Sequence, residues 1–246
     1  LLNKLEMSVG EITDGISQLV MKEENTLESL CEEMVGENIE ICVNFMSRTI
    51  NIKNCNPMGE IMEDIFYSRI KDKLDIHEGP KQASPDYYIN REKEDGGYEL
   101  ELKTFKGSPG FDISNYNSFI DQLNRDGGVY RKFFKTKYII FEYEEITTGF
   151  KIVKCHDKRL WEILSYDKKY PIPIQNKKNI WYNIRPGSIN TWNDKSKTPH
   201  ICIKAILESI LICPSIDDKE TKMECIKKQW FDIKTSHPEL NLQPLE

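Results

Sequence analysis

Charged residues on one expected strand are the first candidates for chemistry in this chain. Residues 98–105, with the sequence YELELKTF, alternate in polarity, which predicts a strand with one buried face. Side chains alternate across a strand, so Glu99, Glu101 and Lys103 project from the same face. The strand therefore presents two carboxylates and an ammonium together.

A further carboxylate lies just upstream. A short strand is expected at 87–89, directly after Asp86, and the intervening polar run that ends in DGG is typical of a hairpin connection. Pairing this strand with 98–105 would bring Asp86 next to Glu101. Two converging carboxylates repel each other unless a cation such as Mg²⁺, which takes oxygen ligands, lies between them. The pair therefore predicts a metal site, and a solvent-exposed strand with an ordinary Glu–Lys pair is the alternative.

These residues also match a known motif. Pro85-Asp86 followed by Glu101-Leu102-Lys103 resembles the PD-(D/E)xK motif of the restriction-endonuclease-like nuclease superfamily. The resemblance implies a Mg²⁺-dependent phosphodiester hydrolase. In such an enzyme Asp86 and Glu101 would hold the metal, and Lys103 would orient the attacking water and stabilise the developing charge.

The segment before the two strands predicts a helix that carries another carboxylate. Residues 58–70, MGEIMEDIFYSRI, place their apolar side chains on one stripe. Glu63 lies at the edge of this stripe, and Glu60 lies nearly opposite to it. In the nuclease family such a helix often supplies a glutamate four residues after a glycine, which is the spacing from Gly59 to Glu63. We therefore expect Glu63 to assist the metal, with Glu60 in reserve, and the alternative is that these acidic residues only keep the helix soluble.

The order of the expected elements predicts the fold. A short strand at 74–77 follows the helix, and the apolar segment 137–143 reads as a buried central strand with a partner at 150–153. A helix over 113–123 is expected between the strand 98–105 and the strand 137–143, with Asp112 as its N-cap. The order α-β-β-β-α-β describes a mixed β-sheet flanked by helices, which is the α/β, restriction-endonuclease-like core that the resemblance implies.

A single nuclease domain over residues 1–246 is expected, because a chain of this length can bury one substantial core. Apolar stripes from Leu5 to Leu19 and from Leu27 to Met34 predict helices near the N-terminus, and residues 39–45 fit either a strand or a helix. The expected parts are a helical N-terminal extension at 1–56, a catalytic core at 58–155, and a DNA-contacting loop with C-terminal helices at 156–246.

The net charge of −6 is unevenly distributed along the chain. Residues 1–66 contain 13 acidic and 4 basic side chains, whereas residues 151–204 contain 12 basic and 4 acidic ones. Within 165–200, Lys and Arg alternate with aromatic residues, a composition that suits a surface touching phosphates and bases. The candidate DNA contacts of this segment are Lys177, Lys178, Arg185, Asn190 and Trp192.

The glycine-containing loop after Lys103 offers a second set of candidate DNA contacts. These are Ser108, Asn115 and Asn117. These residues are equally suited to turns and helix caps, and for the segment 165–200 the alternative to the favoured DNA contact is a proline-punctuated loop over the sheet.

Composition argues against several other classes of protein. No apolar run approaches the length of a membrane span, and the N-terminal sequence lacks the order of a secretory signal, so we expect a cytoplasmic protein without a membrane partner. The seven cysteines and four histidines are scattered without metal-ligand spacing, which argues against a disulfide framework and a zinc site.

Together these features predict a Mg²⁺-dependent type II restriction endonuclease that cleaves double-stranded DNA in a sequence-specific manner as a homodimer. No GxxxxGK(S/T) loop occurs, so cleavage would depend on the protein's own binding of DNA, and two-fold-symmetric sites are normally read by two-fold-symmetric proteins. Three alternatives stay open: a structure-specific repair or recombination nuclease, a DNA-binding protein with an inert nuclease-like site, and an interaction module built on the acidic helices.

Overall fold

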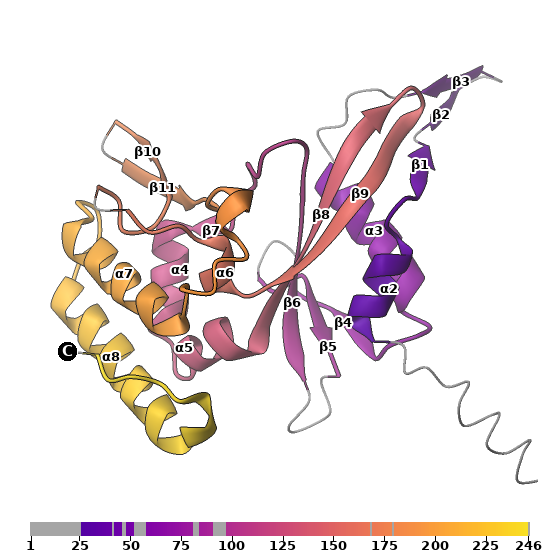
Figure 1. Cartoon of the computed structure of the whole chain (residues 1–246). Coiled ribbons are helices and arrows are strands. Elements are labelled where there is room, and N and C mark those ends of the chain that lie inside the picture. Colours follow the sequence, from indigo (N-terminus) through magenta and orange to yellow (C-terminus); the bar gives the residue numbers. More distant parts are fainter. Residues whose placement is uncertain are drawn as a thin grey trace, which may run out of the picture.

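A mixed sheet forms the centre of the fold (Figure 1). The structure is a computed structural model, and it describes residues 26–40, 42–45, 48–51, 58–80, 84–90, 97–167, 169–178 and 180–245. Within these residues the sheet has six strands in the order β1-β9-β8-β6-β5-β4. Strands β6 and β8 are parallel, and the other neighbours are antiparallel. The strands are β1 (Asn38–Glu40), β4 (Ile76–Glu78), β5 (Tyr87–Ile89), β6 (Tyr98–Phe105), β8 (Thr136–Ile146) and β9 (Gly149–Lys158).

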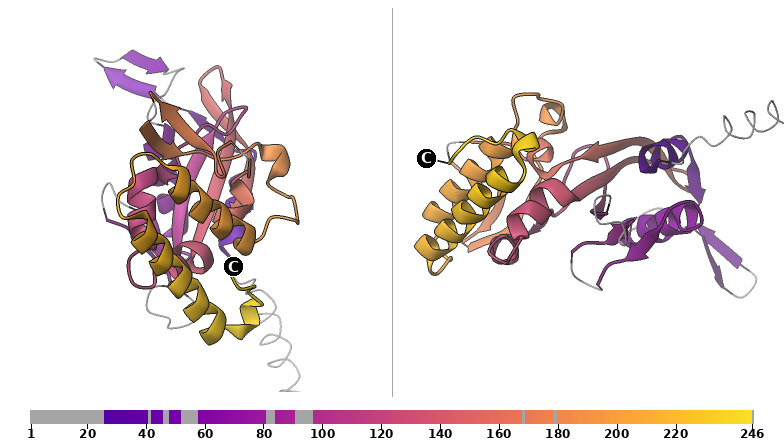
Figure 2. Two further views of the ribbon diagram at one scale, coloured as in Figure 1. Left: turned by 90° about the vertical axis from the view of Figure 1, so that its left-hand side faces the viewer. Right: turned by 90° about the horizontal axis from the view of Figure 1, so that it is seen from below.

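Helices lie on both sides of the strands. On one side are α2 (Leu27–Glu33) and α3 (Met58–Ile70). On the other side are α4 (Tyr116–Leu123), α5 (Gly128–Tyr130), the π-helical turn η2 (Arg131–Lys135), α6 (Leu160–Ile163), α7 (Pro199–Ile212) and α8 (Lys219–Ser236). Figure 2 shows α7 and α8 separated from α2 and α3 by the strands. No helix in the described part of the chain is both long and apolar enough to cross a bilayer.

The central strand β8 contributes to both cores. Ile139 and Phe141 pack with α2 and α3, and Tyr138 and Ile140 pack with the helices on the opposite side. Side chains of a strand alternate between two faces, so a strand that is covered on both faces is apolar throughout. This explains the uninterrupted apolar run at residues 138–141 of β8.

A smaller sheet connects two segments that are distant in sequence. It contains β10 (Ile174–Lys177), β11 (Ile180–Ile184) and β7 (Ser114–Asn115), in that spatial order and all antiparallel. A separate pair is formed by β2 (Cys42–Phe45) and β3 (Arg48–Asn51). Two short 3₁₀ turns, η3 (Ile189–Thr191) and η4 (Pro238–Leu240), complete the assignment.

The predicted α/β architecture is confirmed. From α3 to β8 the strands of the main sheet and helix α4 follow the predicted order, and β9 pairs with β8 as expected. The short strand β7 of the small sheet precedes α4, and α5 and η2 follow it. The predicted helix 58–70 has the bounds of α3, and the predicted strand 98–105 has those of β6. The predicted strand 87–89 likewise has the bounds of β5.

The N-terminal segment differs from the expected helical extension. The stripe from Leu27 forms α2, capped by the Thr26 side chain, which accepts the Ser29 N–H at 3.1 Å. Residues 38–40, however, form the edge strand β1, in which Ile39 pairs with Phe150 of β9. The stripe from Leu5 to Leu19 lies outside the described residues.

Two further expectations are corrected. Helix α4 begins at Tyr116 with Asn115 as its N-cap, because residues 114–115 are held in β7, and Asp112 caps nothing there. The segment 165–200 is less irregular than expected, because it contains the β10–β11 hairpin.

Replacing Phe66 with alanine is expected to lower the free energy of unfolding by about 3–5 kcal/mol, because a buried ring leaves a cavity. Phe66 on α3 is 0% exposed, and its ring centre lies 5.6 Å from that of Tyr87 and 6.3 Å from that of Phe141. Phe231, which is 66% exposed, provides the control, and its replacement should change the free energy by less than about 0.5 kcal/mol. Urea denaturation measures both, and equal losses would contradict the packing of α3 on the sheet.

Candidate active site

A lysine ammonium lies between two carboxylates on neighbouring strands. Lys103 Nζ is 3.1 Å from Glu101 Oε2 and 3.4 Å from Asp86 Oδ2. The same Asp86 oxygen accepts the backbone N–H of Leu102 at 2.7 Å, which fixes this carboxylate against β6. The structure therefore brings together the three residues that carry the motif.

Strand register accounts for this convergence. Tyr87 pairs with Leu100 in the antiparallel β5–β6 ladder, so Asp86 lies opposite Glu101. Leu100 and Leu102 belong to the core on the α3 side, and Glu101 projects to the other side of the strand. The alternation of β6 thus combines a packed face with a charged one.

Burial and ion pairing set the protonation states of these groups. Burial raises the pKa of Asp86 above its ordinary value, and the charge of Lys103 opposes this only in part. Burial acts in the same direction on Glu101, but the charges of Lys103 and Lys132 outweigh it and hold the pKa of Glu101 below its ordinary value. For Lys103, burial favours the neutral form, but the two carboxylates outweigh it and raise the pKa. Lys103 is therefore an ammonium at neutral pH.

The surroundings of the two helix glutamates differ. Glu63 on α3 is half-buried, and its backbone carbonyl accepts the Tyr87 hydroxyl at 2.9 Å, which ties α3 to β5. Burial raises the pKa of Glu63, and the charge of Asp86 raises it further, whereas the charge of Lys103 lowers it. Glu60 is exposed. Glu63 therefore lies close enough to the motif residues for the charges of Asp86 and Lys103 to act on it.

Asp86 and Glu101 fit a hard divalent cation. Both place a carboxylate oxygen within hydrogen-bonding distance of one ammonium, so their oxygens converge on a single positively charged position. Mg²⁺ is commonly held by one or two carboxylates together with water and substrate phosphate oxygens. Among the described residues, no three His, Cys, Asp or Glu side chains are grouped closely enough to hold a metal by themselves. The carboxylate pair therefore suits a metal that is bound jointly with a phosphate.

Two cations that the sequence analysis did not identify stand next to the cluster. Lys132 Nζ lies 3.6 Å from Glu101 Oε1 and donates a hydrogen bond to the Ser84 hydroxyl. Arg131 Nε lies 3.4 Å from Glu99 Oε1. Both cations belong to η2, immediately before β8. The parallel register of β6 and β8 brings them to the carboxylates, and no local spacing in the sequence signals it.

The candidate DNA contacts of two distant segments fall on the small sheet. Asn115 of β7 pairs with Asn183 of β11, and its side chain donates to the Tyr182 carbonyl at 3.1 Å. Lys177 Nζ lies 5.9 Å from the centre of the Tyr182 ring, and the adjacent Lys178 is exposed at the turn of the hairpin. The other exposed candidates are Ser108, Asn117 and Asn190.

Two candidates are less available than the sequence suggested. Trp192 is 1% exposed, packs against the Phe105 ring, and donates its indole N–H to the Gly187 carbonyl at 3.1 Å. Because it fills the core, the structure does not support the expectation that Trp192 faces DNA. Arg185 is held in the protein by an ion pair of 2.9 Å with Asp112 and by a hydrogen bond to a carbonyl of the same loop.

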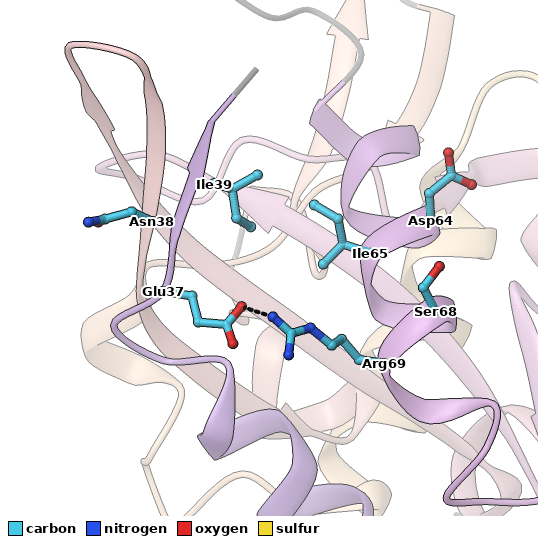
Figure 3. A pocket seen from close by; sticks show the side chains of 7 residues that line it. All are labelled: Glu37, Asn38, Ile39, Asp64, Ile65, Ser68 and Arg69. Atoms are coloured by element: carbon cyan, nitrogen blue, oxygen red, sulfur yellow. Dashed lines mark hydrogen bonds and ion pairs between the residues drawn. The ribbon is translucent and has the colours of Figure 1, made fainter. Parts of the chain in front are cut away.

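A separate hollow of about 410 Å³ opens between β1 and α3 (Figure 3). Across this hollow, Arg69 Nη2 forms an ion pair with Glu37 Oε2 at 2.9 Å. Its lining residues are Glu37, Asn38, Ile39, Asp64, Ile65, Ser68 and Arg69. None of the motif residues lines this hollow, so it is distinct from the candidate active site.

Comparisons with known proteins agree on one family. A model of the family described as NgoBV restriction endonuclease matches residues 20–235. The type II restriction enzyme NlaIV of Neisseria lactamica is 29% identical over 134 residues, which are 52% of this chain and 52% of that protein. The solved structure of the NlaIV restriction endonuclease matches with a TM-score of 0.71 and 19% identity, over 91% of this chain and 92% of that chain. The sequence match thus spans about half the length of the curated relative, and the structural match shows a shared fold.

The Glu63→Gln exchange is expected to weaken Mn²⁺ binding by about tenfold, because Glu63 lies beside the charges of Asp86 and Lys103 and adjoining groups tune metal affinity. Glu60→Gln is the matched control on the same helix, and its exposed position predicts wild-type affinity. Isothermal titration calorimetry compares the two variants. Equal and small losses would show that α3 does not reach the metal.

Proposed function

Because this chain belongs to the NgoBV restriction endonuclease family, we propose that it hydrolyses phosphodiester bonds of double-stranded DNA at a specific sequence, with Mg²⁺ as the cofactor. The observation that carries the proposal is the cluster of Asp86, Glu101 and Lys103, whose charged atoms meet on adjacent strands. The family match confirms the predicted resemblance to restriction endonucleases, and the curated relative is itself named a type II restriction enzyme.

In this proposal the two strand carboxylates bind the metal. Asp86 is fixed by the Leu102 N–H and Glu101 by the ammonium groups at either end of its carboxylate, so both present their oxygens in defined directions. Glu63 assists from α3. Mg²⁺, when bound, supplies positive charge at the scissile phosphate and acidity to a coordinated water.

Lys103 serves as a fixed positive charge. Its raised pKa keeps the proton on Nζ at neutral pH, so this group donates hydrogen bonds and does not act as a general base. Next to a bound phosphate it orients the attacking water and stabilises the negative charge that develops in the transition state. The residue therefore contributes to the rate more than to DNA affinity.

The proposed DNA surface is the small sheet together with the loop that follows β6. Lys177 and Lys178 supply positive charge for the phosphates, whereas Asn115 and Tyr182 lie beside them on β7 and β11. The further proposed contacts are Ser108, Asn117, Arg185 and Asn190. Strand pairing between β7 and β11 brings Asn115 beside the hairpin that carries Lys177 and Lys178, which supports this proposal.

We further propose a cytoplasmic homodimer, since a two-fold-symmetric site is most simply read by a two-fold-symmetric protein. Light scattering of the purified protein with and without DNA tests the dimer.

A structure-specific repair nuclease and a DNA-binding protein with an inert site are the competing functions. Plasmid digestion in Mg²⁺ separates the three functions. A restriction enzyme yields discrete fragments, a repair nuclease cuts at random or at particular DNA structures, and a protein with an inert site leaves the DNA intact.

Asp86→Asn, Glu101→Gln and Lys103→Ala are each expected to lower the cleavage rate by about 10²–10³-fold or more, because each removes charge at the reacting phosphate. Lys227→Ala is the control outside the proposed DNA surface, since Lys227 lies on α8 and its ammonium pairs with Glu224 at 3.3 Å. Single-turnover cleavage measures the rates, and Ca²⁺-supported DNA binding shows whether the variants still bind. Near wild-type cleavage by Glu101→Gln would refute the assigned site.

The double substitution Lys177→Ala/Lys178→Ala is expected to weaken binding to all duplexes alike. Each lost phosphate contact lowers the slope of log affinity against log salt by about 0.9, so titrations at several salt concentrations report how many are lost. Unchanged affinity and slope would show that the β10–β11 hairpin does not face DNA.

A comparison of the two single variants Arg185→Ala and Asp112→Ala tests whether Arg185 reads a base. If Arg185 reads a guanine, its loss reduces discrimination by about 1–3 kcal/mol, and Asp112→Ala leaves discrimination intact. If its ion pair with Asp112 only orders the loop, both variants lose affinity equally and retain the same sequence preference.

A further inference from the structure

The Glu101 carboxylate is held from both ends. Lys103 Nζ lies 3.1 Å from Oε2, and Lys132 Nζ lies 3.6 Å from Oε1. The Lys103 ammonium is shared with Asp86, whereas Lys132 approaches from η2, on a different part of the chain. Two contacts on opposite oxygens fix the rotation of a carboxylate, which one contact does not.

Lys132 is buried far more deeply than a lysine normally is. Its side chain is 4% exposed, compared with 18% for Lys103, so the ammonium is shielded from solvent. A buried ammonium requires partners, and Glu101 together with the Ser84 hydroxyl provides them. Ser84 lies two residues before Asp86. Lys132 therefore connects the segments that carry the two carboxylates.

The backbone that carries Lys132 is itself closely fixed. Residues 131–135 form a π-helical turn. Such turns are rare in proteins overall, and many of those that occur lie at functional sites. Thr136 is the first residue of β8, and its hydroxyl oxygen lies 3.0 Å from the Arg131 carbonyl and 3.1 Å from Glu99 Oε2, the two acceptors that share its one proton. The same Thr136 pairs with Glu99 in the parallel ladder. The turn is therefore positioned directly by the strand that carries Glu101.

We propose that Lys132 is a positioning residue that orients the Glu101 carboxylate for metal binding and does not contact DNA. The inference rests on the proposed function, in which Glu101 is a metal ligand. Because Lys132 is shielded from solvent, its effect reaches the metal only through Glu101. Removing it should lower metal affinity and turnover while leaving DNA affinity unchanged.

Lys132→Met removes the charge and keeps the apolar stem of the side chain. Lys135→Met is the matched control, because Lys135 belongs to the same turn and its ammonium lies 5.9 Å from the Tyr130 ring centre. Lys132→Arg restores a cation, and Ser84→Ala removes the other hydrogen-bond partner. Urea unfolding first shows which variants are folded.

Mn²⁺ titration by calorimetry and steady-state cleavage then give the two readouts. We expect Lys132→Met to lower Mn²⁺ affinity and kcat by about 10–100-fold, as is usual for groups that support a metal ligand, with KM for DNA unchanged within about twofold. Lys132→Arg should recover part of the loss, and Lys135→Met should behave as the wild type. In the Glu101→Gln background, Lys132→Met should have no further effect on Mn²⁺ affinity.

Wild-type Mn²⁺ affinity and kcat in folded Lys132→Met would overturn the proposal, as would an equal loss in Lys135→Met. If Lys132→Met does not fold, Ser84→Ala and Lys132→Arg decide. A lower kcat at constant KM in both variants supports the role, and a variant of either kind with wild-type kcat refutes it. Failure of the proposed function is recognised separately, by a wild-type protein that cuts no DNA or by unchanged Mn²⁺ affinity in Glu101→Gln.

Discussion

Two carboxylates that lie side by side in a protein interior require a cation, and the Lys103 ammonium meets this requirement here. Without it, Asp86 and Glu101 would repel each other in surroundings that screen charge poorly, and β5 and β6 would pair at a considerable cost. The ammonium instead attracts both carboxylates, and the backbone N–H of Leu102 adds a further contact to Asp86. The local chemistry and the pairing of the strands thus depend on the same ion cluster.

Local patterns in the sequence were sufficient for elements in which apolar and polar residues recur at a regular spacing. The stripe of α3 and the alternation of β6 are set by contacts along one helix or strand, so their bounds followed directly. Lys132 was missed because its contact with Glu101 depends on the register of β6 with β8, which local spacing does not encode. Trp192 was misjudged for a related reason, since aromatic residues among lysines look alike whether they face solvent or the core.

The small sheet changes how the basic segment relates to the catalytic strand. From the sequence, the loop after Lys103 and the segment 165–200 were two separate candidate surfaces. Pairing of β7 with β11 places them side by side, and the Arg185–Asp112 ion pair fastens the loop to the end of β11. The proposed metal ligand Glu101 and the proposed DNA contacts Ser108, Asn115 and Asn117 are therefore carried by one chain segment leading from β6 through β7 to α4.

The parallel pairing of β6 with β8 has a consequence for synthesis of the chain on the ribosome. The motif residues emerge early, but η2 and β8 follow only after the crossover through α4, and β1 must wait for β9 to complete its edge of the sheet. Pairings between distant segments form late, because the intervening chain must first be closed into a loop. A nascent chain that ends before η2 therefore carries the whole motif without the Lys132 contact to Glu101, so the charged cluster is complete only when synthesis is well advanced.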